Sequence, residues 1–156
     1  MTAFPPFWPR AALAVLSVWA MAGAGAVLLH AEEVVVINGD TLLVAGEPIH
    51  LLGIEAPRRD ASCSRDGRAY PCGEEATRAL ERLVAGAEVR CDGLEGPRFG
   101  DVITASCKAD GRDLAGELVR LGWARADLRY ASRYEHDEAA ARAARRGLWA
   151  GTTPWP

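Results

Sequence analysis

The strongest constraint on the fold is a stretch of three strand-like segments separated by tight turns. The first segment reads Val-Val-Val-Ile and is β-branched throughout, which favours a strand. It ends at Asn38-Gly39, a dipeptide typical of the turn in a β-hairpin. The chain is therefore predicted to contain a three-stranded antiparallel meander. Its strands are expected at residues 34–37, 41–44 and 49–54, with the second turn at Gly46-Glu47.

The remaining segments alternate between helix-like and strand-like patterns. Asp113 is expected to cap a short amphipathic helix, and Gly147 to end the last helix. Five short strands with helices after the third and at the end predict an α+β fold, a five-stranded OB-type barrel with three helices. The other expected elements are a polar loop over 58–72, helices over 73–84, 114–121 and 132–146, and strands over 87–91 and 102–108.

The first residues have the pattern of a targeting segment. Arg10 precedes an uncharged run over residues 11–29 that is long enough to span a bilayer. The run is typical of a signal peptide or of a retained N-terminal membrane anchor, and both place the rest of the chain outside the cytoplasm, in the periplasm or secreted. The expected organisation is a targeting segment over 1–31 (anchored by 11–30 if uncut), a domain over 32–150 and a tail over 151–156.

Four cysteines lie beyond the targeting segment, and an even number in an exported small domain indicates disulfides. Four cysteines allow three pairings. Cys63 and Cys72 bracket one short polar loop, whereas Cys91 and Cys107 each sit in a strand-like run. We predict the pairs 63–72 and 91–107. A zinc site is the weaker alternative, because the chain has no CxxC pair and its histidines are scattered.

An ordered series of short motifs resembles the thermonuclease family, the staphylococcal nuclease-like proteins. The resemblance covers roughly residues 33–149 and implies an OB-type barrel that hydrolyses DNA and RNA phosphodiesters with one calcium ion. In that family two carboxylates bind the metal, a glutamate acts on the attacking water, and two arginines hold the phosphate. The motifs are Asn-Gly-Asp-Thr at 38–41, the active-site strand at 50–58, Cys-Gly-Glu-Glu-Ala at 72–76, and segments at 108–114, 117–124, 134–135 and 146–149.

The resemblance implies a metal site formed by three residues of this chain. Asp40 matches the first metal carboxylate, and Thr41 stands beside it. Glu55 matches the second carboxylate on a stem one methylene longer. Calcium is therefore the cofactor that the resemblance implies. The alternative for Asp40 is an acid that serves only the hairpin turn.

Three positions that the family uses for catalysis are substituted here. His50 stands for the first arginine, Arg58 for the catalytic glutamate, and Asp101 for the second arginine. Histidine lacks the guanidinium fork, arginine cannot act as a base, and aspartate repels phosphate. The alternative for His50 is a partly buried strand residue, and for Arg58 a solvated loop charge. Asp60, Glu74 and Glu75 are candidate replacement bases.

These substitutions lead us to expect an exported thermonuclease-like domain that has lost most or all nuclease activity and serves as a binding or scaffold module. The alternative is a calcium-dependent phosphodiesterase that acts on single-stranded DNA or RNA through a rebuilt site. A formal net charge of −3 does not favour nucleic acid as a partner. A protein partner, or the membrane through an uncut N-terminal segment, is the other expectation. Arg125, Arg129 and Arg133 are spaced four residues apart and are interpreted as a solvated face.

Overall fold

The computed structural model describes residues 34–93, 98–99, 102–127, 129, 132–153 and 155. The expected targeting segment over residues 1–31 and the substituted position Asp101 lie outside these ranges. Within them, no helix is both long enough and apolar enough to cross a membrane.

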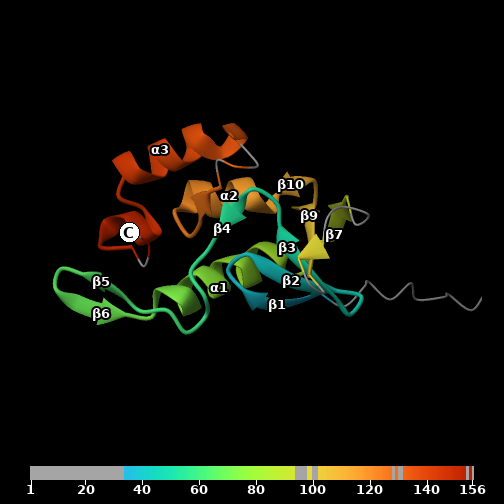
Figure 1. Cartoon of the computed structure of the whole chain (residues 1–156), viewed down its shortest axis with the longest axis horizontal. Coiled ribbons are helices and arrows are strands. Elements are labelled where there is room, and N and C mark those ends of the chain that lie inside the picture. Colours follow the sequence, from blue (N-terminus) through green and yellow to red (C-terminus); the bar gives the residue numbers. More distant parts are fainter. Residues whose placement is uncertain are drawn as a thin grey trace, which may run out of the picture.

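A seven-stranded sheet that curls into a half-barrel forms the centre of the described chain (Figure 1). Its strands are β1 (Val34–Asn38), β2 (Thr41–Val44), β3 (Glu47–Leu51), β7 (Val89–Asp92), β8 (Arg98–Phe99), β9 (Val102–Ala109) and β10 (Arg112–Asp113). β1, β2 and β3 form the predicted antiparallel meander, and β3 then pairs in parallel with β9. The long strand β9 also pairs with β7, β8 and β10, so it joins the two halves of the sheet.

Three α-helices of the described chain pack around this sheet, as the sequence predicted: α1 (Cys72–Val84), α2 (Leu114–Leu121) and α3 (Glu135–Ala143). α1 packs against β1, whereas α2 packs against β9 and α3 (Figure 1). The Asp113 side chain caps α2, because its Oδ1 accepts from the backbone N–H groups of Ala115 and Gly116 at 3.2 and 3.5 Å. The α+β class and the OB-like architecture are therefore confirmed.

The hydrophobic core lies between the sheet and the helices. Alternating residues of the strands and one face of each long helix fill it, which is the periodicity that the sequence shows. Its largest fully buried aliphatic side chains include Leu42, Ile49, Leu51, Ile54, Leu80, Leu114, Leu118 and Val119.

The third strand ends earlier than the sequence predicted. β3 begins at Glu47 and stops at Leu51, where a turn redirects the chain. Gly53 in this turn has φ +82°, a conformation that glycine adopts with little strain. The next two residues form β4 (Ile54–Glu55), which leaves the sheet and pairs with β11 (Arg125–Ala126). The predicted 49–54 strand is thus two strands with different partners.

The predicted polar loop over residues 58–72 contains a hairpin. β5 (Cys63–Arg65) and β6 (Arg68–Tyr70) pair around the Asp66-Gly67 turn. An Asp-Gly dipeptide strongly favours a hairpin turn. The sequence pattern did not predict this hairpin, because the residues around the dipeptide are polar and are typical of a loop. Cys72, predicted to close the loop, is the first residue of α1.

The last predicted helix is also shorter than residues 132–146. A 3₁₀ turn over Ser132–Tyr134 precedes α3, which ends at Ala143. The chain reverses at Arg145, whose φ is +51°, before a second 3₁₀ turn over Gly147–Ala150. This reversal lets the Leu148 N–H donate to the Gly122 carbonyl at 2.9 Å, a tertiary contact that outweighs continuation of the helix.

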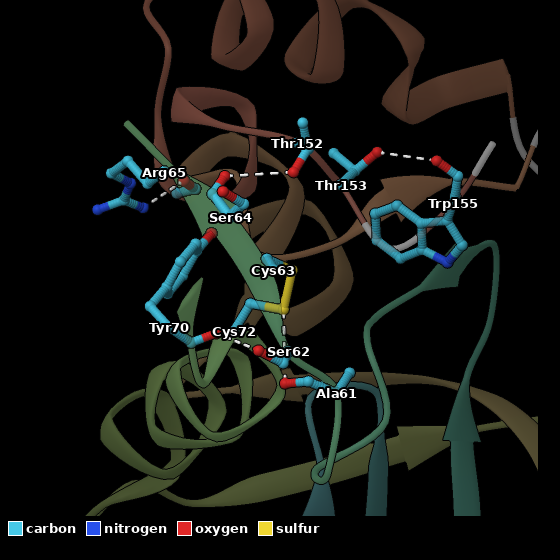
Figure 2. The surroundings of a disulfide bond; sticks show 11 residues. Ala61, Ser62, Cys63, Ser64, Arg65, Tyr70, Cys72, Thr152, Thr153 and Trp155 are labelled. Carbon is cyan, nitrogen blue, oxygen red and sulfur yellow. Dashed lines mark hydrogen bonds between the residues drawn. A yellow bond between two sulfur atoms is a disulfide. The ribbon is translucent and has the colours of Figure 1, made fainter. Parts of the chain in front are cut away.

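Both predicted disulfides are present. Cys63–Cys72 ties the β5–β6 hairpin to the first residue of α1, with a Cα–Cα distance of 5.6 Å (Figure 2). Cys91 and Cys107 are directly opposite each other on β7 and β9. All four cysteines are thereby used, so they hold no zinc. Two disulfides indicate an oxidising, extracytoplasmic environment.

Candidate functional site

Asp40 occupies the turn between β1 and β2 and is only 6% exposed. Its Oδ2 accepts from the buried Ala56 N–H at 2.7 Å, and its Oδ1 accepts from the Thr41 hydroxyl at 2.9 Å. The turn packs closely against Ala56 and Ala76 because Gly39 has no side chain. A Cβ at Gly39 would lie 2.8 Å from the Cβ atoms of both alanines. The carboxylate thus fastens the first hairpin to the segment that follows β4.

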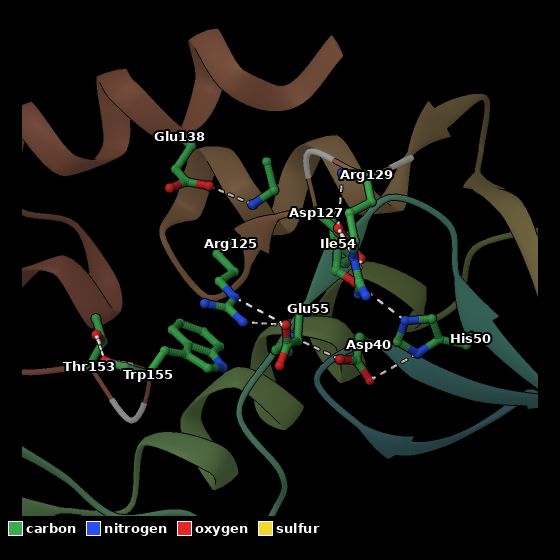
Figure 3. A network of polar contacts seen from close by, with 12 residues as sticks. Asp40, His50, Ile54, Glu55, Arg125, Asp127, Arg129, Glu138, Thr153 and Trp155 are labelled. Carbon is green, nitrogen blue, oxygen red and sulfur yellow. Dashed lines mark hydrogen bonds and ion pairs between the residues drawn. The ribbon is translucent and has the colours of Figure 1, made fainter. Parts of the chain in front are cut away.

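His50 on β3 faces Asp40 across the meander (Figure 3). Its Nδ1 lies 3.5 Å from Asp40 Oδ1, and its Nε2 lies 3.3 Å from the carbonyl oxygen of Ile54. Both neighbours accept hydrogen bonds, so the protonated ring satisfies them at once. The hydrogen bond with Asp40 raises the pKa of His50 above its usual 6.5, although partial burial opposes the shift.

Glu55 on β4 lies directly opposite Arg125 on β11. Arg125 donates from Nε and Nη2 to the Glu55 Oε2 at 3.0 and 2.6 Å (Figure 3). The guanidinium carbon of Arg125 also lies 4.8 Å from the ring centre of Trp155 in the C-terminal tail. Glu55 therefore has a permanent cation as its immediate partner.

Arg58 points into solvent, with 85% of its side chain exposed. It pairs with Asp60, itself 75% exposed, at 3.4 Å. Such a pair adds little to stability. Arg58, which the resemblance predicts at the position of the family's catalytic glutamate, is therefore turned toward water.

The acids named as replacement bases lie on the surface beside arginines. Asp60 contacts Arg58, and both Glu74 and Glu75 pair with Arg78 along one face of α1, at 2.8 and 3.0 Å. These pairs occupy the carboxylates in local contacts of the loop and the helix.

Two adjoining pockets flank the site. The larger has a volume of about 930 Å³, and its lining includes Thr41 and His50 together with apolar groups of β1, β3 and β9. The smaller, of about 600 Å³, is lined by Glu55 and Arg125 and by residues of α3. Asp127 and Arg129 line both pockets, so they stand between the two.

The sequence did not identify Arg125, Asp127 and Arg129 as site residues. Arg125 lies in β11 and Arg133 in the 3₁₀ turn over Ser132–Tyr134, so the four-residue spacing does not place these arginines on one helix. Arg129 instead pairs with Asp127 at 2.8 Å, and this contact lowers the pKa of Asp127 below its usual 3.8. Only the pairing of β11 with β4 places this segment beside Glu55, and no local pattern reports that pairing.

Two comparisons with known proteins identify the family of the chain. The family described as Staphylococcal nuclease homologue matches residues 48–151, a range that includes His50, Glu55 and Arg58. "Succinoglycan biosynthesis protein ExoI" from Rhizobium meliloti (strain 1021) is 33% identical over 114 residues, which are 72% of this chain. The aligned part is 59% of the length of that relative. The chain belongs to the Staphylococcal nuclease homologue family.

Proposed function

We propose that this protein is an extracytoplasmic binding or scaffold module of its family, with phosphodiester hydrolysis lost or strongly reduced. One observation carries the proposal: each retained carboxylate is held by groups of the chain itself. Asp40 is engaged by Ala56, Thr41 and His50, and Glu55 is engaged by Arg125.

The residues present do not fit a resident calcium ion. Calcium takes six to eight oxygen ligands, among which carboxylates carry most of the charge. Here both Asp40 oxygens accept hydrogen bonds, and Glu55 Oε2 accepts two from Arg125. An ion would have to displace Arg125 before it could use that oxygen, and we derive no catalytic step through it.

The substitutions also remove the groups that act on phosphate. Loss of one donor that stabilises developing charge costs about 10²–10³ in turnover, and loss of a general base about 10²–10⁴. Such effects do not simply multiply, because catalytic residues act as a unit. Even one of them places hydrolysis orders of magnitude below that of a complete site. His50 offers only single donors in place of a fork, and Arg58 is exposed.

The ligand surface that we propose is the larger pocket beside His50. Its walls combine apolar groups such as Leu52, Ile54 and Val102 with the polar edge formed by Asp127 and Arg129. The net charge of −3 supports a ligand other than a bare phosphate backbone.

The alternative, a calcium-dependent phosphodiesterase with a rebuilt site, has one observation in its favour. Asp127 and Arg129 add a carboxylate and a guanidinium to the walls shared by the two pockets. In this alternative they would take over the roles of a base and a phosphate clamp.

Cleavage of single-stranded DNA by the full-length chain in millimolar calcium separates the two functions. The proposal expects no cleavage above background from protein that is folded by circular dichroism. Cleavage that is abolished by Asp40→Asn in folded protein would refute it and support the rebuilt site. Arg129→Ala would then be the next variant, with the exposed Arg58→Ala as its control.

A further inference from the structure

Arg125 makes the closest charge contact to the second metal-position carboxylate. Its Nη2 lies 2.6 Å from Glu55 Oε2, and its Nε lies 3.0 Å from the same oxygen. The side chains are 35% and 42% exposed, so the pair is partly shielded from water. Two donors from one guanidinium on one carboxylate oxygen form a charge-assisted contact that a competing cation must break.

The C-terminal tail contributes to the position of this guanidinium. The ring of Trp155 lies 4.8 Å from the Arg125 guanidinium carbon, within the range of a cation–π contact. The ring centres of Trp155 and Trp149 are 6.4 Å apart, and the angle between the two ring planes is 39°. Arg125 is therefore held between a carboxylate and an indole.

The tail is itself attached to the β5–β6 hairpin. The Thr152 N–H donates to the Ser64 carbonyl at 2.8 Å. The Thr152 hydroxyl donates to the same carbonyl at 3.3 Å, and the Thr153 hydroxyl donates to the Trp155 carbonyl at 3.1 Å (Figure 2). Ser64 follows Cys63, which the disulfide to Cys72 anchors on α1. A chain of contacts thus runs from the disulfide through the tail to Arg125.

We propose that Arg125 is the built-in cation of this site: it occupies the Glu55 carboxylate that a divalent ion would need as a ligand, and Trp155 of the tail holds it there. The inference goes beyond the proposed function, because it concerns which cation the carboxylates hold. Its consequence is that removal of Arg125 should free Glu55 and raise the affinity of the chain for calcium.

The chain supplies a matched control in Arg142. Its guanidinium carbon lies 3.8 Å from the Trp149 ring centre, and its Nη2 lies 2.6 Å from Glu138 Oε1. Arg142 therefore repeats the arrangement of an arginine between an indole and a carboxylate, but its carboxylate is Glu138 rather than Glu55. Its removal lowers the net charge equally without releasing Glu55.

Calcium binding to the full-length chain, measured by isothermal titration calorimetry at constant ionic strength, tests the proposal. Arg125→Met should bind calcium about tenfold more tightly than wild type or better, because a unit positive charge beside the ligand is gone. Arg125→Gln, which keeps donors for Glu55, is the second variant and should also bind more tightly. Arg142→Met should match wild type.

Two further variants identify the ligands and the role of the tail. Glu55→Gln in the Arg125→Met background should abolish the gain, because Glu55 is the carboxylate that the loss of Arg125 releases. Trp155→Ala should give a smaller gain than Arg125→Met, since the guanidinium is then free to leave Glu55.

The proposal is overturned if folded Arg125→Met and Arg125→Gln bind calcium no more tightly than wild type, or if Arg142→Met gains as much. An unchanged dissociation constant for Trp155→Ala overturns the role of the tail. The calcium measurements test Arg125 and not the proposed function. If wild type cleaved DNA but bound calcium weakly, the proposed function would be refuted, whereas the assignment of Arg125 as the built-in cation would stand.

Discussion

Replacement of Asp40 by alanine tests whether this buried acid holds the domain together. The change removes the acceptor for the Ala56 N–H at 2.7 Å and for the Thr41 hydroxyl at 2.9 Å. A hydrogen bond to a charged group contributes about 1.5–3 kcal/mol, and an unsatisfied buried N–H costs about 1–3 kcal/mol. These ranges describe overlapping effects, so we expect Asp40→Ala to lower the free energy of unfolding by about 2–4 kcal/mol.

The assay is urea unfolding at pH 7, followed by tryptophan fluorescence and by circular dichroism. Asp40→Asn keeps an acceptor oxygen for the Ala56 N–H and should lose less stability than Asp40→Ala. Asp60→Ala is the control, because Asp60 is 75% exposed and pairs with solvent-exposed Arg58. It should change stability by about 0.5 kcal/mol or less.

A loss below about 0.5 kcal/mol for Asp40→Ala would refute the reasoning, since it would show that the hydrogen bonds of this carboxylate do not stabilise the fold. The result also bears on the cleavage assay. If Asp40→Ala is strongly destabilised, loss of activity in that variant cannot be assigned to chemistry, and Asp40→Asn becomes the informative control.

Three further predictions concern stability. The folded-state pKa of His50 is raised above 6.5, so the stability that its protonated ring contributes is fully present below pH 6.5 and is lost as pH rises through the folded-state pKa. The urea midpoint should therefore fall over that pH window, and His50→Gln should flatten the fall. Replacing Cys91 and Cys107 together by serine should cost about 2–5 kcal/mol, and a melting temperature unaffected by reducing agent would contradict a stabilising role for the disulfides. Leu118→Ala, at a fully buried position, should lower the free energy of unfolding in urea by about 2–5 kcal/mol. Leu121→Ala, at a 42% exposed position, should lower it far less, and equal losses of stability would contradict the assigned core.

Several features could be predicted from the sequence because short-range chemistry decides them. Asn38-Gly39 predicts a turn that lies one residue later, at Gly39-Asp40, because Asn38 ends β1 and pairs with Thr41. Asp113 caps α2 through N–H groups two and three residues away. The disulfide pairs also follow from local context, since Cys63 and Cys72 close one short hairpin and Cys91 and Cys107 lie on paired strands. Asp66-Gly67 shows that even a local signal can be missed when the surrounding polarity is interpreted as a loop.

The sequence by itself determined the family and the meander, and it predicted which residues stand at the family's metal and catalytic positions. Only the tertiary structure decided what those residues touch. Glu55 and Arg125 are 70 residues apart, and Thr152 reaches Ser64 across 88 residues. Such contacts arise when β4 leaves the sheet to pair with β11 and when the tail folds back on the hairpin. Charge partners are chosen by packing of the whole chain, because an ion pair acts through distance in space and not along the sequence.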